Sequence, residues 1–157
     1  REVTLDDLAE LTYLTAVIKE GMRIAYVVTL SFQRSVPKDM VICGYRIPKG
    51  TVIFAAGTRA RNFEDMWEDP NAFLPERWLT DEDMSHKYYF GFGFGPRDCP
   101  GQKLAMLEMR LTIIRLITRY QFTLKGTWEE LLNNARDGLV TEVRDGVWIN
   151  FTPRTAH

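Results

Sequence analysis

Residues 92–102 place a glycine-rich loop, a single cysteine and a proline directly before the most apolar helical pattern of the chain. We expect Cys99 to take the cap position of a helix over residues 101–120. Pro100 would then occupy the first helical position, where its missing N–H costs nothing. The next backbone amides would face the sulfur, with the positive end of the helix dipole behind them. Both effects favour a thiolate over a thiol.

Cys99 has two ordinary interpretations besides that of a metal ligand. A lone cysteine is most often an inert, buried, small apolar side chain, and another possibility is a redox-active thiol. Zinc fits poorly, because His86, His157 and the two cysteines include no closely spaced ligand pair. A thiolate held by helix amides, with Arg97 two residues before it, suits the axial position of a haem iron.

The first third of the chain alternates between helical and extended patterns. Apolar residues at three- and four-residue steps predict a helix over residues 4–23, and Thr4 and Asp7 have the spacing of a capping box. Residues 24–32 are rich in Val, Thr and aromatic side chains, which predicts an extended segment. Residues 40–54 are expected to form two short strands.

The rest of the chain predicts a long loop, a helix and a hairpin. Residues 58–85 lose periodicity and are expected to be a loop with at most short helices. The helix over 101–120 is apolar around most of its circumference, which predicts burial on several sides. Residues 138–144 and 147–152 are expected to pair across Asp145-Gly146. The fold class predicted is α+β, mainly α, in one unit.

Composition excludes several classes of protein. The chain has 157 residues, of which 45% are hydrophobic, enough for one globular core. Twenty Lys and Arg against 21 Asp and Glu give a net charge of −1, which argues against a nucleic-acid partner bound mainly by charge. Two cysteines cannot form a disulfide framework. The longest uncharged run, residues 24–33, is too short to span a bilayer as a helix.

The pattern Phe92-x-x-Gly95-x-Arg97-x-Cys99-x-Gly101 resembles the haem-binding signature of the cytochrome P450 family at every defining position. The resemblance implies that Cys99 is the thiolate ligand of a haem iron. It also implies that Arg97 binds a haem propionate, and that Phe92, Gly95 and Gly101 belong to the haem-binding loop.

Two further motifs support this resemblance. Glu20 and Arg23 match the family's Glu-x-x-Arg, and residues 73–78 resemble its Pro-Glu-Arg-Phe segment, with Trp78 in place of the usual Phe. Spacing alone favours a solvated ion pair between Glu20 and Arg23. The resemblance instead implies a buried triad of Glu20, Arg23 and Arg77 that locks the helix to the loop preceding the cysteine.

The resemblance also assigns substrate and partner sites. Arg34 lies where the family places a second propionate-binding arginine, although it could equally be an ordinary surface charge. Residues 25–31 and 138–143 match segments that line the substrate pocket, and their apolar character predicts an apolar small molecule; plain strand core is the alternative. Basic residues of the helix after the cysteine could dock an acidic redox partner or simply be solvated: Lys103, Arg110, Arg115 and Arg119.

Nearly the whole chain takes part in the resemblance, which implies that residues 1–157 are the C-terminal part of a single cytochrome P450 domain. The family's distal acid–alcohol pair has no counterpart in this sequence, so no catalytic residue is assigned. The parent would be a monooxygenase of eukaryotic type, resembling fungal members, on the endoplasmic reticulum membrane, with electrons from a flavoprotein reductase or a ferredoxin. The alternatives are a non-catalytic fragment that binds haem and a haem-free structural or interaction domain.

Overall fold

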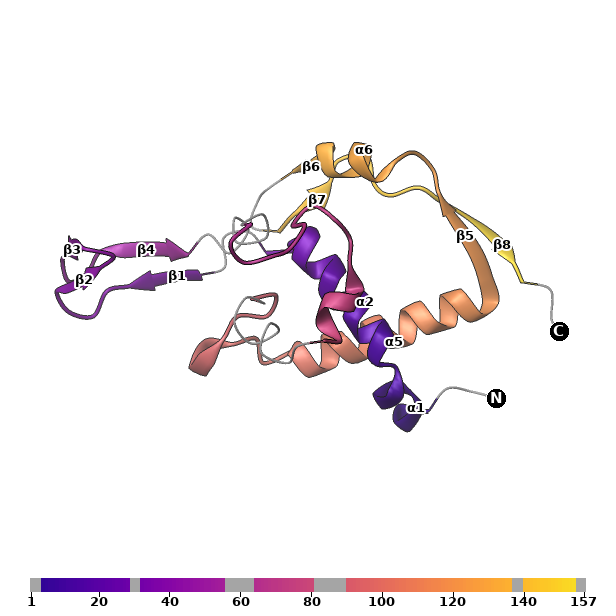
Figure 1. Cartoon of the computed structure of the whole chain (residues 1–157), viewed down its shortest axis with the longest axis horizontal. Coiled ribbons are helices and arrows are strands. Elements are labelled where there is room, and N and C mark those ends of the chain that lie inside the picture. The colour runs from indigo at the N-terminus through magenta and orange to yellow at the C-terminus, as the bar shows by residue number, and fades with distance from the viewer. Residues whose placement is uncertain (1–3, 29–31, 56–63, 81–89, 137–139, 155–157) are drawn as a thin grey trace.

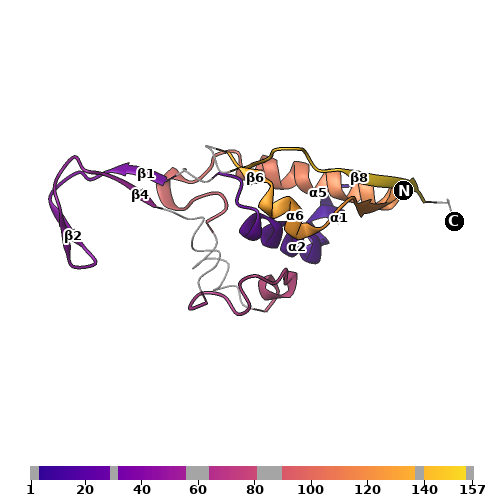
Figure 2. The same ribbon diagram turned by 90° about the horizontal axis from the view of Figure 1, so that it is seen from above.

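The computed structural model consists of helices and four two-stranded sheets, arranged around two helices that cross (Figure 1). The strands between residues 32 and 55 project to one side of these helices, and the sheet formed by residues 120–124 and 149–153 lies on the opposite side (Figure 2). The residues that the structure describes are 4–28, 32–55, 64–80, 90–136 and 140–154.

The N-terminal helical pattern forms two helices, α1 (Leu5–Glu10) and α2 (Thr12–Ile24), so the prediction of one helix was wrong. Leu11 breaks the helix, with φ −80° and ψ 65°. The break changes the direction of the chain. As a result α1 packs on the helix after the cysteine, and α2 packs both on that helix and on the short helix over residues 75–78. The capping box is confirmed: the Asp7 amide donates to Thr4 Oγ1 over 3.3 Å, and the Thr4 amide donates to Asp7 Oδ2 over 2.8 Å.

The hydrophobic core beside α2 is built around two tryptophans. Ala16 of α2 is buried together with Trp67 and Trp78, and Met66 packs against them. The two indole rings lie 5.4 Å apart between centroids, tilted by 53°. Trp78 ends the 3₁₀ helix η1 (Pro75–Trp78), the one helix in residues 64–80. The predicted long loop therefore contains a short helix, and its remaining residues, 58–63 and 81–85, lie outside the described part.

Two antiparallel ribbons follow α2. Strand β1 (Phe32–Ser35) pairs with β4 (Val52–Ala55), and β2 (Met40–Ile42) pairs with β3 (Tyr45–Ile47). Residues 40–54 thus hold three strands rather than the two expected. The turn between β2 and β3 has Cys43 at φ 48° and Gly44 at φ 84°, the positive-φ pair that a tight hairpin turn requires.

The extended segment expected over residues 24–32 is only partly present. Helix α2 continues through Ile24, and strand β1 begins at Phe32. Residues 25–28 are irregular, and 29–31 lie outside the described residues. The helix runs one residue further than predicted because the Ala25 amide still donates to the Gly21 carbonyl, over 2.8 Å, and closes the last turn.

The helix after the cysteine, α5 (Gln102–Arg119), has no buried residue, so the prediction that it is buried on several sides was wrong. Leu104, for example, is 60% exposed. In the described part of the chain, only α1, α2 and the strand that follows contact α5 extensively. These neighbours cover part of its circumference, and the remaining apolar side chains stay accessible.

The C-terminal hairpin predicted across Asp145-Gly146 is also wrong. Strand β8 (Ile149–Pro153) pairs with β5 (Tyr120–Leu124), which directly follows α5. Cross-strand contacts of aromatic rings favour this pairing, because Phe151 packs against Tyr120 and Phe122 with centroids 5.8 and 6.0 Å apart.

The Asp145-Gly146 turn nevertheless forms. Gly146 has φ 72°, and its amide donates to the Val143 carbonyl over 3.0 Å. The turn follows β7 (Glu142–Val143), whose partner is β6 (Ala135–Arg136) just after helix α6 (Trp128–Asn133). It therefore links two separate sheets instead of closing one hairpin. No helix among the described residues combines the length and the apolar character that crossing a bilayer requires.

Candidate haem site

Glu20 is the most completely buried charged residue of the described chain, with 0% exposure. Arg23, one turn further along α2, donates from Nε to Oε2 and from Nη2 to Oε1, each over 2.9 Å. Arg77 of η1 donates from Nε to Glu20 Oε1 over 3.1 Å. The structure thus brings together the three residues of the expected triad, and the solvated ion pair favoured by spacing alone is wrong.

Two further donors reach the same carboxylate. The Trp78 indole N–H donates to Glu20 Oε2 and the Leu74 amide donates to Oε1, each over 2.9 Å. Sequence reasoning missed both. The sequence did hold a signal for the Trp78 contact. The family usually has Phe at this position, and the indole of Trp78 adds an N–H donor that Phe lacks. The Leu74 contact is made by backbone and leaves no sequence signal.

The two arginines use their remaining N–H groups on backbone carbonyls of the loop before η1. Arg23 donates to the carbonyls of Pro70 and Ala72, and Arg77 donates to that of Glu68, over 2.8 to 3.1 Å. Because one side of the cluster is α2 and the other is this loop, the charges fix the loop against the helix.

The pKa of Glu20 reflects two opposed effects. Burial raises the pKa, but hydrogen bonds from Arg23, from the Leu74 amide and from Trp78, with the positive charge of Arg23, outweigh burial. The net result is a pKa below the ordinary value for a glutamate. Glu20 is therefore a carboxylate in the native state at neutral pH.

The cysteine loop is held by hydrogen bonds within its own backbone. The Gly93 amide donates to the Phe90 carbonyl over 3.0 Å, and the Cys99 amide donates to the Phe92 carbonyl over 2.8 Å. Residues 90–94 are not helical, and from Gly95 the chain forms the 3₁₀ helix η2 (Gly95–Arg97). Gly93 and Gly95 have φ of 80° and 71°, which only glycine adopts readily.

Cys99 lies three residues before α5 instead of capping it, so the predicted cap position was wrong. Gly101 is the N-cap, and the Gln102 amide donates to the carbonyl of Cys99, over 3.2 Å, within a turn that leads into the helix. A Cβ at Gly101 would lie 3.8 Å from Cys99 Sγ, so Gly101 is close to the sulfur. Cys99 is exposed, which contradicts the inert buried alternative.

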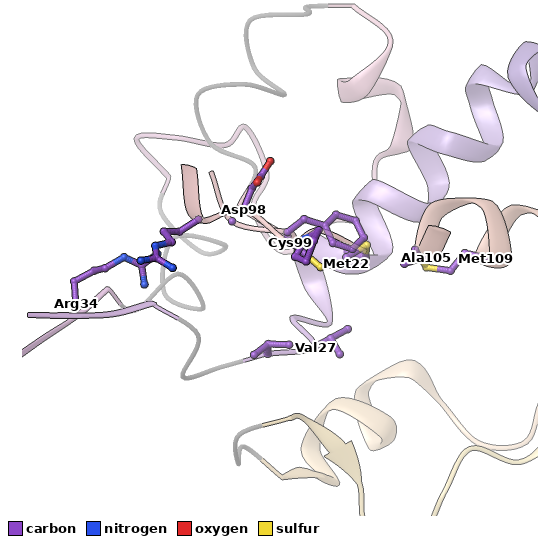
Figure 3. A pocket seen from close by; sticks show the side chains of 13 residues that line it. Met22, Val27, Arg34, Asp98, Cys99, Ala105 and Met109 are labelled. Atoms are coloured by element: carbon purple, nitrogen blue, oxygen red, sulfur yellow. The ribbon is translucent and has the colours of Figure 1, made fainter. Parts of the chain in front are cut away.

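A cavity of about 570 Å³ collects side chains from four separate segments of the chain. Figure 3 shows Arg34 extending from strand β1 toward the loop that carries Asp98 and Cys99. Gly95 and Gly101 do not line this cavity. Its lining residues are Met22, Val27, Val28, Arg34, Gly91, Phe92, Gly93, Arg97, Asp98, Cys99, Pro100, Ala105 and Met109.

Residues of both segments expected to line a substrate pocket meet in one cavity, but it is not the cavity that Cys99 lines. Val27 and Val28 line the cavity of Cys99, whereas none of the described residues 140–143 does. Thr141 and Val143 line a second cavity, of about 620 Å³, which shares Val27 with the first.

The basic residues of α5 also differ from one another. Lys103, Arg115 and Arg119 are exposed, whereas Arg110 is partly buried and its Nε is an unpaired buried donor in the described structure. Arg110 faces α2: burial lowers the pKa of Lys19, and the positive charge of Arg110 lowers that pKa further. Arg110 therefore differs in its burial from the solvated basic residues of the same helix, Lys103, Arg115 and Arg119.

Comparisons with known proteins agree on one family. The family model described as Cytochrome P450 matches residues 1–148. Probable cytochrome P450 12c1, mitochondrial, of Drosophila melanogaster is 38% identical over 130 residues, covering 76% of this chain and 25% of that protein. Cytochrome P450 monooxygenase aclL of Aspergillus oryzae is 37% identical over 127 residues, covering 78% and 26%.

Two other matches cover almost all of the chain. Cytochrome P450 4V2 of Rattus norvegicus is 37% identical over 156 residues, covering 98% of this chain and 29% of that protein. The solved structure of retinoic acid bound cyanobacterial CYP120A1 superimposes with a TM-score of 0.87 at 27% identity, covering 98% of this chain and 35% of that one.

The chain belongs to the cytochrome P450 family, whose fold binds haem through a cysteine thiolate. It spans about a quarter of the length of the first curated relatives it matches. The relatives include insect, fungal and rodent proteins, so they do not single out fungal members.

The cavity fits this cofactor in its chemistry. One thiol suits a haem iron, two guanidinium groups suit the propionates, and Val27, Phe92 and Met109 provide apolar surface for a flat macrocycle.

Proposed function

We propose that this chain supplies the proximal part of the haem site of a monooxygenase acting on an apolar small molecule, and that residues 1–157 are the C-terminal part of one cytochrome P450 domain. One observation carries the proposal. A single cavity collects Cys99, Arg97 and Phe92 of the cysteine loop with Arg34 of a distant strand. Phe92, Arg97 and Cys99 belong to the family signature, and Arg34 lies where the resemblance implied a second propionate-binding arginine.

Each of these residues has a distinct role in the proposal. Cys99 gives its sulfur to the iron, and Gly101 lies close to that sulfur. Arg97 and Arg34 bind the two propionates, since a guanidinium can form paired hydrogen bonds to a carboxylate. Phe92 would provide apolar surface for the macrocycle. When bound, a thiolate-ligated haem supplies the activation of O2, because the thiolate pushes electron density toward the iron.

The scaffold residues act at a distance from the haem. Glu20, Arg23 and Arg77 fix the loop that contains η1 against α2, and α2 contributes Met22 to the cavity wall. The triad thereby holds one wall of the site in place. Its role is structural, because none of its three members lines the cavity.

The substrate proposal rests on the apolar side chains of Val27 and Val28, which line the same cavity as Cys99. We further propose that the intact parent resides on the endoplasmic reticulum membrane and receives electrons from a flavoprotein reductase. Exposed Lys103, Arg115 and Arg119 would contribute to docking. A ferredoxin is the alternative donor, and a tagged parent protein found in mitochondria would favour it.

The activity is tested with the intact protein, a flavoprotein reductase, NADPH and ¹⁸O2. Lauric acid and testosterone serve as apolar probes, and mass spectrometry follows the incorporation of one ¹⁸O atom. Labelled product that disappears in Cys99→Ala but persists in Cys43→Ala supports the proposal. In the contrary outcome the reductase reduces the haem and the probes perturb its spectrum, yet no probe gains oxygen. That result would overturn the monooxygenase assignment and favour a haem-binding protein without turnover.

A further inference from the structure

Tyr26 lies where three segments of the chain meet. It follows the end of α2 by two residues and is only 7% exposed. Its hydroxyl donates to the Phe90 carbonyl over 3.1 Å, and that carbonyl stands at the beginning of the cysteine loop. A tyrosine buried at this point therefore ties the end of a helix to a loop 64 residues further along the chain.

The carbonyl that Tyr26 binds is part of the framework of the loop. The same Phe90 oxygen accepts the Gly93 amide over 3.0 Å, and the Phe92 oxygen accepts the Cys99 amide over 2.8 Å. By donating to the Phe90 carbonyl, the Tyr26 hydroxyl thus anchors the first of two turns that place the side chains of Phe92 and Cys99. Both of these side chains line the 570 Å³ cavity.

Thr141 holds the other side of Tyr26. The Thr141 hydroxyl donates to the Tyr26 carbonyl, and the Thr141 amide donates to the carbonyl of Val27, each over 2.7 Å. Thr141 lines the second cavity, and Val27 lines both cavities. Residues 26–27 therefore connect two segments: their backbone carbonyls accept from Thr141, and the Tyr26 hydroxyl donates to the loop of the cysteine.

We propose that Tyr26 is a positioning residue that fixes the cysteine loop relative to the Thr141 segment. It acts through the Phe90 carbonyl and touches neither the sulfur nor the reacting atoms. A phenylalanine would fill nearly the same volume, so the hydroxyl is what the proposal singles out. The geometric claim concerns this chain alone, and its consequence for a bound haem rests on the function proposed above.

Amide hydrogen exchange of the chain without cofactor tests the geometric claim. In Tyr26→Phe, exchange at the Gly93 and Cys99 amides should become about tenfold faster, the factor expected for losing one hydrogen bond. Exchange at Phe122 and Thr123 in β5 should stay unchanged. Tyr45→Phe is the matched control, because Tyr45 is 74% exposed on β3. Unchanged exchange at both loop amides in a folded Tyr26→Phe protein would overturn the proposal.

Variants of Thr141 test the same connection without altering the tyrosine. Thr141→Val removes the hydroxyl bond to the Tyr26 carbonyl but keeps the amide bond to Val27. Exchange at the amide of residue 141 and at Gly93 should then rise severalfold, while Thr141→Ser should restore the original rates. Rates that are the same in Thr141→Val and Thr141→Ser would contradict the role assigned to the hydroxyl.

The haem-loaded protein gives a separate readout. With carbon monoxide bound to the reduced protein, Tyr26→Phe should convert part of the thiolate-type Soret band to the band of a protein without thiolate ligation. If loop exchange is faster in Tyr26→Phe but neither the original protein nor any variant takes up haem, the proposed function is contradicted and the positioning role stands. A normal thiolate band together with unchanged exchange in Tyr26→Phe would remove the positioning role alone.

Discussion

Trp78 donates its indole N–H to Oε2 of Glu20 over 2.9 Å, although the two residues lie 58 positions apart. The bond completes the set of donors around this carboxylate. The two charged donors are the arginines of the expected triad, whereas the indole and the Leu74 amide are neutral. The indole bond also explains how this chain uses a tryptophan where its family usually has phenylalanine. The ring packs beside Trp67 in the core while its polar edge reaches the buried carboxylate.

Replacing Trp78 by phenylalanine should therefore destabilise the fold by more than the loss of side-chain volume alone would. The substitution keeps an aromatic ring but removes a hydrogen bond to a charged group, which is worth about 1.5–3 kcal/mol. Urea unfolding followed by circular dichroism measures the effect. Trp128→Phe is the control, since Trp128 is 44% exposed and should change the free energy of unfolding by less than about 0.5 kcal/mol. Equal effects of the two variants would refute the account of Trp78.

Replacing Glu20 by glutamine should have the largest effect of any single change in the cluster. The amide lacks the charge that the buried Arg23 and Arg77 share, and removing one partner of a buried ion pair costs about 3–5 kcal/mol. The free energy of unfolding in urea measures this cost. Glu108→Gln, at an exposed position of α5, should be nearly neutral. A loss below about 1 kcal/mol in Glu20→Gln would argue that the cluster adds little to stability.

The pH dependence of stability should report the same carboxylate. The pKa of Glu20 in the native state lies below its unfolded-state value, because the donors outweigh the effect of burial. The stabilisation is therefore complete above the unfolded pKa of about 4.3 and is lost as the pH falls through the lower native value. Unfolding free energies measured from pH 6 down to pH 2 should fall more steeply in the original protein than in Glu20→Gln. Parallel curves would contradict the lowered pKa.

Replacing Arg97 by glutamine should weaken haem retention without unfolding the loop. Arg97 is exposed at the end of η2 and lines the cavity, so in the proposed site the change would remove a charged hydrogen bond to a propionate and little packing. We expect haem transfer to apomyoglobin to become about ten- to a hundredfold faster. Arg34→Gln should act in the same direction, whereas Arg136→Gln on β6 should not. Haem loss unaffected by both cavity variants would exclude them as propionate ligands.

The sequence predicted local chemistry better than it predicted long-range pairing. The capping box of Thr4 and the turn at Asp145-Gly146 follow from residues close together in the chain, and both are present. The Glu20 cluster required the family resemblance, because spacing alone cannot tell a buried pair from a solvated one.

Two of the predictions that failed depend on partners far along the chain, whereas the break at Leu11 and the place of Cys99 before α5 are local failures. Strand β8 pairs with β5 rather than with its neighbour, since Phe151 finds Tyr120 and Phe122 across the sheet. The apolar pattern of α5 was taken to mean burial, but periodicity describes a helix and does not say which neighbours cover it. The Tyr26 contact with Phe90 was missed because a tyrosine at the end of a helix gives no sign of its partner.

Whether Cys99 ligates the haem iron is decided by the carbon monoxide difference spectrum of the reduced protein. The intact protein is compared with Cys99→Ala and with Cys43→Ala, which alters the other exposed cysteine. If Cys99 is the ligand, Cys43→Ala will retain a thiolate-type Soret band and Cys99→Ala will lose it. A thiolate-type band that survives in Cys99→Ala would exclude Cys99 as the ligand.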